Sequence, residues 1–205
     1  MLVKCLRAID FGYKRIHPHV TIPICKVLNR FHVRPSYITI IRIGLLLGFF
    51  LGWINNHYIL SVLLLVIYGF FDIIDGELAR LIGTDSDLRK FQDLMADNLM
   101  VVILPLALIL QEQVSGFIGA YYIFIATLSW WLSVLKLNDP KESNWIIRAQ
   151  ASTLLHLLRF WIIPISIFLY AFFSIEIFSE IMIILSTILT ISSLYDYCVL
   201  IRIKM

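Results

Sequence analysis

Charged side chains are scarce in this chain. Lys, Arg, Asp and Glu make up 15% of the 205 residues, whereas hydrophobic residues make up 60% and the mean hydropathy is +0.87. A water-soluble domain of this length buries one core, but it cannot bury this much Leu, Ile, Val and Phe. The composition excludes an ordinary soluble domain and predicts that lipid is the solvent for most of the protein.

Cysteine is also rare, and the net charge is small. The only cysteines are Cys5, Cys25 and Cys198, far apart and without CxxC spacing, which excludes a disulfide framework or a zinc cluster. The net charge is only +3, and we expect no nucleic-acid partner. We expect no cleavable signal peptide either, because residues 1–35 are basic and the first long apolar run begins after them.

Long apolar runs, by contrast, are abundant. A bilayer core about 30 Å thick needs roughly 20 apolar residues per helix. Six segments approach or reach this length: 37–54, 58–76, 92–111, 116–136, 154–173 and 178–201. The sequence therefore predicts an all-α integral membrane protein, with six transmembrane helices in a catalytic domain at 36–205 and an interfacial amphipathic segment at 1–35.

The basic residues are distributed unevenly around these runs. Of the 17 Lys and Arg residues, 15 lie in the N-terminal segment, the 2–3 and 4–5 connections with their helix ends, or the C-terminus. The positive-inside rule then places both termini in the cytoplasm, and we expect the inner membrane of a bacterium. Residues 1–33 mix bases with apolar residues, which favours binding to anionic lipid, although the bases alone also set topology.

Half of the 14 acidic residues fall between positions 71 and 97. Asp72 and Asp75 are three apart, and Asp93 and Asp97 are four apart, so on helices each pair projects from one face. One pair ends the second predicted membrane helix and the other opens the third. The sequence predicts that the two faces meet near the cytoplasmic interface.

Such a gathering of carboxylates needs compensation. An ionised carboxylate beside hydrocarbon costs several kcal/mol, and neighbouring carboxylates repel one another. Proton uptake or bound cations would stabilise the arrangement. Asp-rich oxygen sites suit Mg²⁺, Mn²⁺ or Ca²⁺, and two such ions are a recurring device for displacement at phosphorus.

Small residues and an arginine follow the first pair. Gly76 and Ala79 lie near the same helix face, where they would let a ligand approach the backbone. Arg80 comes next, and a guanidinium binds phosphate oxygens in bidentate fashion. The alternative is that Arg80 only extends to the interface and helps to set topology.

The pattern Asp72-x-x-Asp75-Gly76-x-x-Ala79-Arg80, continued by Asp93 and Asp97, resembles the signature of the CDP-alcohol phosphotransferase family. The resemblance covers 26 residues and extends to the plan of six membrane helices with cytoplasmic termini. Residues 35–42 also resemble the family's opening of the first membrane helix. At one fixed position the family has glycine and this chain has Arg89.

The resemblance implies roles for the matching residues. Asp72, Asp75, Asp93 and Asp97 would bind metal, Mg²⁺ or Mn²⁺ as a two-ion site, and Asp97 would also be the catalytic base that takes the proton of the acceptor hydroxyl. The CDP-binding residues would be Gly76, Ala79 and Arg80, with Thr39 as a further candidate. CMP would be the leaving group.

Arg89 leaves three interpretations open. It stands four residues before Asp93, so its side chain can turn to water, bind an anionic acceptor or the donor phosphate, or pair with Asp93 and impair metal binding. Arg148 and Arg159 are further candidates for contact with an acceptor or phosphate. The alternative is that these two residues only anchor the protein at the membrane interface. Arg42 is expected either to be buried in a pair with a carboxylate or to snorkel to the interface.

The sequence thus predicts a metal-dependent enzyme that transfers a substituted phosphate from a CDP-linked donor, with CDP-diacylglycerol expected, to the hydroxyl of a small alcohol. Membrane lipids are the other expected partners, and family members are often homodimers. Rival hypotheses are transfer of a CDP-linked head group to a diacylglycerol, a divalent-cation carrier, and a non-catalytic relative. The acceptor is not indicated by any segment.

Overall fold

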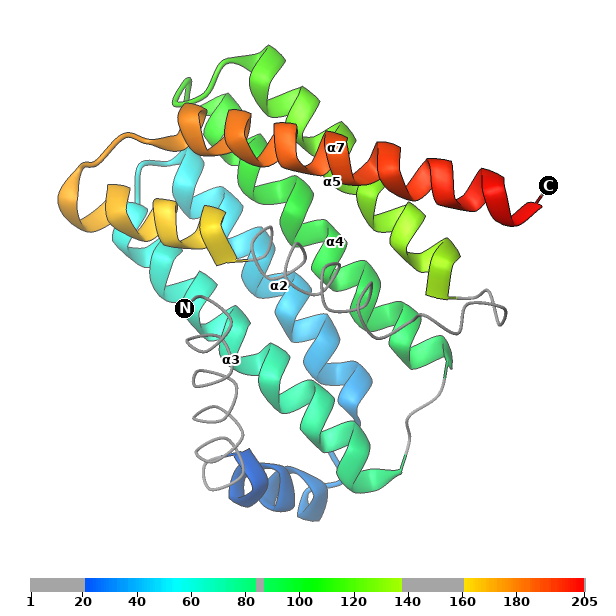
Figure 1. Cartoon of the computed structure of the whole chain (residues 1–205). Helices are drawn as coiled ribbons and strands as arrows, with labels where there is room; N and C mark the ends of the chain where they lie inside the picture. The colour runs from blue at the N-terminus through cyan, green and yellow to red at the C-terminus, as the bar shows by residue number, and fades with distance from the viewer. Residues whose placement is uncertain (1–20, 84–86, 138–160, 205) are drawn as a thin grey trace, which may run out of the picture. The chain divides into compact units, whose positions relative to one another are not determined.

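A computed structural model of the chain describes residues 21–83, 87–137 and 161–204. Every regular element in these ranges is a helix (Figure 1). In chain order the helices are residues 21–30, α2 (Pro35–Ile54), α3 (Tyr58–Ile82), α4 (Asp87–Leu110), α5 (Gly116–Leu137), residues 161–173 and α7 (Phe178–Lys204). The predicted all-α fold is confirmed.

The apolar helices are those expected of a membrane protein. By length and composition, three of them can cross a bilayer: Pro35–Ile54, Tyr58–Ile82 and Phe178–Tyr195. Shorter apolar helices are Met95–Leu110, Gly116–Leu132 and Trp161–Phe173. Each of the six predicted segments coincides with one of these helices, although residues 154–160 lie outside the described residues. The count of six membrane spans stays a prediction.

The contacts divide the chain into two compact units. The first contains the described residues up to Leu45 together with Val66–Ala96, and the second contains Leu46–Leu65 and the described residues from Asp97 onward. α2, α3 and α4 each contribute residues to both units.

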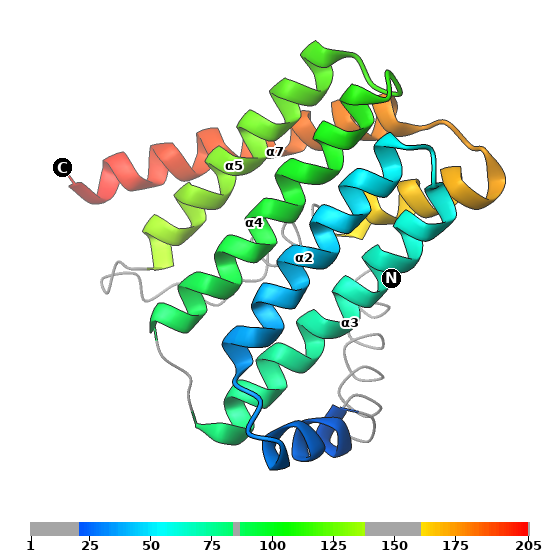
Figure 2. The same cartoon turned by 180° about the vertical axis from the view of Figure 1, so that it is seen from behind.

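The core of the first unit joins the helix at residues 21–30 to α2 and α3. Its fully buried members are Cys25, Ile38, Ile74 and Leu78. Figure 2 shows the helix at residues 21–30 in dark blue, beside the beginning of α2 and the end of α3. The Cys25 thiol lies 3.8 Å from the carbonyl of Ile74. Burial raises the pKa of this thiol, Glu77 raises it further, and Arg80 opposes the shift.

A tight turn sets the entry into α2. His32 has a φ of 55°, and the amide of Val33 donates to the carbonyl of Leu28, the pattern of a helix that ends in a left-handed residue. Pro35 then occupies the first position of α2, where its missing N–H costs nothing. Of the predicted interfacial segment, residues 1–20 lie outside the described residues, and its boundary at residue 35 stays a prediction.

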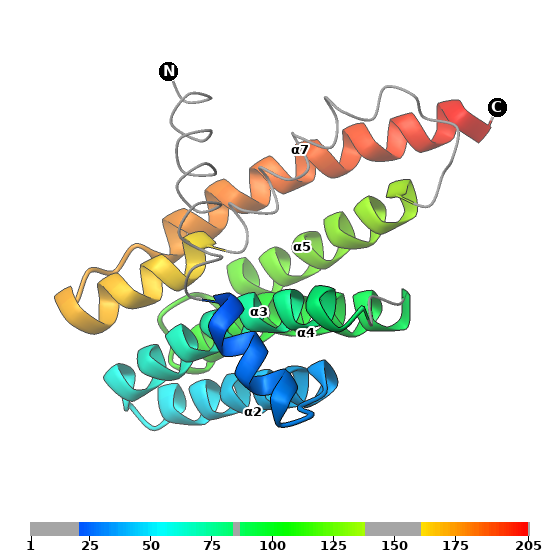
Figure 3. The ribbon, with the colours of Figure 1, turned by 90° about the horizontal axis from the view of Figure 1, so that it is seen from below.

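In the second unit, short turns connect consecutive helices. Trp53 at the end of α2 donates from its indole nitrogen to the Gln113 side chain, in the turn before α5, at 3.1 Å. α5 and α7 run side by side (Figure 3), and the hydroxyls of Tyr121 and Thr190 lie 2.8 Å apart between them. These polar links fix the helices where apolar packing alone is non-directional.

Candidate active site

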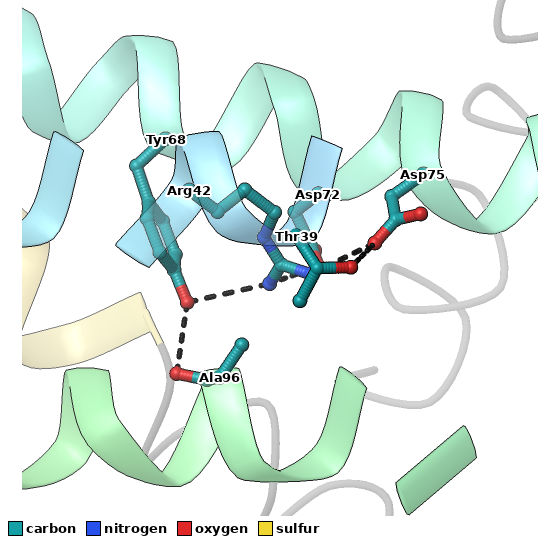
Figure 4. Close-up of polar contacts among 6 residues, drawn as sticks. All are labelled: Thr39, Arg42, Tyr68, Asp72, Asp75 and Ala96. Atoms are coloured by element: carbon teal, nitrogen blue, oxygen red, sulfur yellow. Dashed lines mark hydrogen bonds and ion pairs between the residues drawn. The ribbon is translucent and has the colours of Figure 1, made fainter. Parts of the chain in front are cut away.

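Two acidic residues of α3 meet one arginine of α2. Nη2 of Arg42 lies 2.6 Å from Oδ1 of Asp72, and Nη1 lies 3.7 Å from Oδ2 of Asp75 (Figure 4). Because the two aspartates are three residues apart on a helix, their carboxylates project from one face, as the sequence predicted. The guanidinium thus bridges both carboxylates with two different nitrogens.

All three charged groups are shielded from solvent to some degree. The side chains of Arg42 and Asp75 are 0% exposed and that of Asp72 is 30% exposed. Isolated buried charges cost several kcal/mol each, and close pairing is what makes such burial possible. Of the two alternatives for Arg42, the structure shows the buried pair.

Thr39 reaches the same cluster from one turn earlier on α2. Its hydroxyl donates to Oδ2 of Asp75 at 2.7 Å, and both side chains are buried. A hydroxyl that donates to a carboxylate forms a charge-assisted hydrogen bond, which is stronger than one between neutral groups. The carboxylate of Asp75 is therefore held by two residues of α2, Thr39 and Arg42.

Tyr68 completes the cluster and was not singled out from the sequence. Its ring lies beneath the guanidinium of Arg42, 4.9 Å from centroid to Cζ, and its hydroxyl accepts from Nη2 at 3.3 Å. The same hydroxyl donates to the carbonyl of Ala96 on α4 at 3.1 Å. Its only sequence signal was its place four residues before Asp72, on the same face of a mostly aliphatic helix.

The glycine and arginine of the motif lie further along α3. Nη2 of Arg80 lies 2.7 Å from Oε2 of Glu77, and the Arg80 side chain is 65% exposed. A Cβ built on Gly76 would come 4.0 Å from the same Arg80 nitrogen, so the guanidinium lies over the glycine. Ala79 is buried at 4% exposure. The charged end of Arg80 is thus available to solvent next to a position without a side chain.

The second acidic pair belongs to α4. Asp97 directly follows Ala96 and is partly exposed. For Asp93 and Arg89 the structure describes the backbone, which belongs to α4, but not the side chains. Arg148 and Arg159 lie outside the described residues. Within the described side chains, no group of three or more His, Cys, Asp and Glu residues is placed to hold a metal ion. The predicted convergence of both pairs stays a prediction.

A comparison with protein-family models matches residues 32–192, which is most of the chain, to the CDP-alcohol phosphatidyltransferase model. The chain belongs to this family. The match extends far beyond the 26-residue motif and includes α2, which supplies Thr39 and Arg42 to the cluster. No curated protein and no solved structure matches the chain.

Membership in the CDP-alcohol phosphatidyltransferase family supports an enzymatic role. It supports the transfer of a phosphatidyl group from a CDP-alcohol donor to an alcohol acceptor, in a membrane protein of phospholipid synthesis. The family is generally dependent on a divalent cation. The family prediction made from the spaced aspartates is therefore confirmed.

Proposed function

We propose that this protein transfers a phosphatidyl group from CDP-diacylglycerol to the hydroxyl of a small alcohol and releases CMP. The observation that carries the proposal is that the carboxylates of Asp72 and Asp75 converge on the buried guanidinium of Arg42, in a chain that the family model matches over residues 32–192. Because this is a family of phosphatidyltransferases, a donor that carries the lipid is favoured over one that carries the head group.

The carboxylate pair fits a divalent cation. The oxygens of Asp72 and Asp75 already lie around one positive group, the guanidinium of Arg42. Carboxylate oxygens are the donors that Mg²⁺ and Mn²⁺ prefer. In the proposal, Asp72 and Asp75 act with Asp93 and Asp97 to hold a two-ion centre. When bound, these ions neutralise the pyrophosphate of the donor and the charge on the departing CMP.

The residues of the chain supply the proton transfer and the binding contacts. Asp97 accepts the proton of the acceptor hydroxyl, and the acceptor oxygen attacks the phosphorus that carries the lipid. The bond from this phosphorus to the bridging oxygen breaks, and CMP leaves with its electron pair. The products are CMP and the phosphatidyl ester of the alcohol, and the proton remains on Asp97 until it passes to solvent.

Arg80 and its small neighbours are the proposed contacts for the donor. The exposed guanidinium binds a phosphate oxygen once it leaves Glu77, an exchange between two anionic partners. Gly76 and Ala79 leave room for the nucleotide beside α3, with Thr39 as a further contact. Arg89, Arg148 and Arg159 remain candidates for an anionic acceptor. The protein would work in the cytoplasmic half of the membrane, as a monomer or a homodimer.

A reconstituted assay tests the proposal. The purified chain would be incubated with radiolabelled CDP-diacylglycerol, Mg²⁺ or Mn²⁺, and a panel of alcohols, with CMP and lipid products measured together. We expect equimolar CMP and lipid product with at least one alcohol, and no turnover in EDTA. Asp97→Ala should lower the rate by at least about 10²–10⁴-fold, because general-base assistance is lost together with a proposed metal ligand.

The matched control is Glu176→Gln, which removes an exposed acid from the loop before α7 and should leave the rate unchanged. Full activity in Asp97→Ala would disprove the assignment of the base. Binding of Mn²⁺ without CMP release from any CDP-linked donor would instead favour a cation carrier or a non-catalytic relative.

A further inference from the structure

Arg42 lies at the centre of four contacts, and the proposed reaction gives this residue no role of its own. It touches Asp72 and Asp75, its charge lies over the ring of Tyr68, and it donates to the Tyr68 hydroxyl. The side chain has no exposed surface. A buried guanidinium with this many partners has little freedom to rotate, so it fixes the positions of the groups that it touches.

We propose that Arg42 is a positioning residue that holds the carboxylates of Asp72 and Asp75 in the orientation in which they receive the divalent cation. The inference rests on the proposed function, because it assumes that these two carboxylates are metal ligands. A carboxylate has two oxygens, so it can accept a bond from a guanidinium with one and bind a cation with the other. Groups that contact metal ligands in this way commonly raise metal affinity 10–100-fold.

The contacts require arginine in particular. Nη2 contacts Asp72 and Tyr68 while Nη1 contacts Asp75, so the contacts need two nitrogens that belong to one rigid planar group. A lysine at position 42 would keep the charge but offers a single nitrogen, which cannot reproduce this geometry. The inference therefore predicts that charge alone does not replace Arg42.

Tyr68 supports the orientation of the guanidinium. Its hydroxyl lies between Nη2 of Arg42 and the carbonyl of Ala96, and its side chain is 1% exposed. Replacement by phenylalanine would keep the ring beneath Arg42 and remove both hydrogen bonds. Since the ion pairs with the two aspartates remain in that variant, its effect on metal affinity should be smaller than that of a substitution at Arg42.

The test measures metal binding and does not depend on turnover. The full chain in detergent would be titrated with Mn²⁺ at a fixed temperature below unfolding, with free Mn²⁺ followed by electron paramagnetic resonance. The variants are Arg42→Lys, Arg42→Gln and Tyr68→Phe. We expect the Mn²⁺ dissociation constant to rise about 10–100-fold in both Arg42 variants, and by less in Tyr68→Phe.

The control is Arg34→Gln, which removes an exposed cation directly before α2 and should leave the dissociation constant unchanged. Thermal unfolding in EDTA would separate a role in stability from a role in metal binding. If Arg42 were only structural, Arg42→Lys would lower the unfolding temperature and leave the dissociation constant unchanged, which overturns the inference. An increased Mn²⁺ affinity in the Arg42 variants would overturn it as well.

The controls also separate this inference from the proposed function. If the unaltered protein binds no Mn²⁺, the metal-dependent function fails, and the inference fails with it. If the unaltered protein binds Mn²⁺ and the Arg42→Lys and Tyr68→Phe variants bind it equally well, only the positioning role of Arg42 fails. If Arg42→Gln does not fold, the two conservative variants decide the matter.

Discussion

At the scale of single residues, the notable feature is a buried arginine in a helix that is apolar enough to cross a membrane. α2 runs from Pro35 to Ile54, and Arg42 is fully buried within it. A charged side chain in hydrocarbon is expensive, and it is stable only where partners replace water. Asp72, Asp75 and the hydroxyl of Tyr68 are those partners here. The buried charge on α2 and the carboxylates on α3 thus stabilise each other.

The hydroxyl of Thr39 provides a prediction for one contact of this cluster. Thr39→Val keeps the size of the side chain but leaves Oδ2 of Asp75 without its 2.7 Å donor. Hydrogen bonds to charged groups contribute about 1.5–3 kcal/mol, and we expect the free energy of unfolding in EDTA to fall by about that amount. Detergent-induced unfolding followed by circular dichroism would measure it.

Thr39→Ser is the control for this experiment, because it keeps the hydroxyl and should cost much less than Thr39→Val. Equal losses in the two variants would show that the hydrogen bond to Asp75 contributes nothing measurable. The comparison is made without metal, so that changes in cation affinity do not enter the result.

At the scale of elements, glycine lets neighbouring helices approach closely. A Cβ on Gly52 of α2 would lie 2.6 Å from Oγ of Ser61 on α3, and a Cβ on Gly119 of α5 would lie 2.5 Å from two carbons of Ile109 on α4. A Cβ atom essentially never lies this close to a non-bonded heavy atom, so a side chain at either glycine would require its neighbour to move. Close approach through small residues is a common way for membrane helices to pack, since lipid provides no hydrophobic force between them.

We therefore predict opposite effects for the same substitution at two glycines. Gly119→Ala should lower the free energy of unfolding by about 1–3 kcal/mol, because the added methyl group overpacks against Ile109. Gly44→Ala should raise it by about 0.5–1 kcal/mol, because nothing lies within 4 Å of the new Cβ and alanine favours the helix. Unfolding curves of the purified variants would measure both changes in the free energy of unfolding.

The double variant Gly119→Ala with Ile109→Ala checks the cause of the first effect. If the clash with Ile109 is responsible, the double variant loses less than the sum of the two single losses, because the shorter side chain makes room. A destabilisation of Gly119→Ala that is fully additive with Ile109→Ala would contradict the proposed contact.

At the scale of the whole molecule, the distribution of Lys and Arg predicts one orientation in the membrane, with both termini in the cytoplasm. Single cysteines test it, in a background in which the three native cysteines are alanine. Asn29→Cys and Glu176→Cys place exposed thiols before α2 and before α7. In intact cells an impermeant maleimide should label Glu176→Cys and spare Asn29→Cys, and permeabilisation should make both reactive. The reverse pattern would invert the proposed topology.

The sequence by itself determined the class of the protein and most of its helices. Apolar runs are a property of consecutive residues, and helix formation satisfies the backbone locally, so length and hydropathy were enough to locate the described helices. The bounds were less exact, since α3 continues six residues beyond the predicted end at 76 and α4 begins five residues before the predicted start at 92. The motif from Asp72 to Asp97 was also readable, since spacing along a helix fixes which side chains share a face. The family prediction followed from it.

Only the tertiary structure decided which groups satisfy the buried charges. From the sequence, Arg42 had two possible environments, Thr39 was a candidate contact for the nucleotide, and Tyr68 had no role. The structure places Arg42 and Thr39 against Asp75, and Tyr68 against Arg42 and the carbonyl of Ala96. These contacts join residues 26 to 36 positions apart, and such distant pairing depends on how the helices pack. Periodicity describes one helix at a time and carries no information about the partner that it meets.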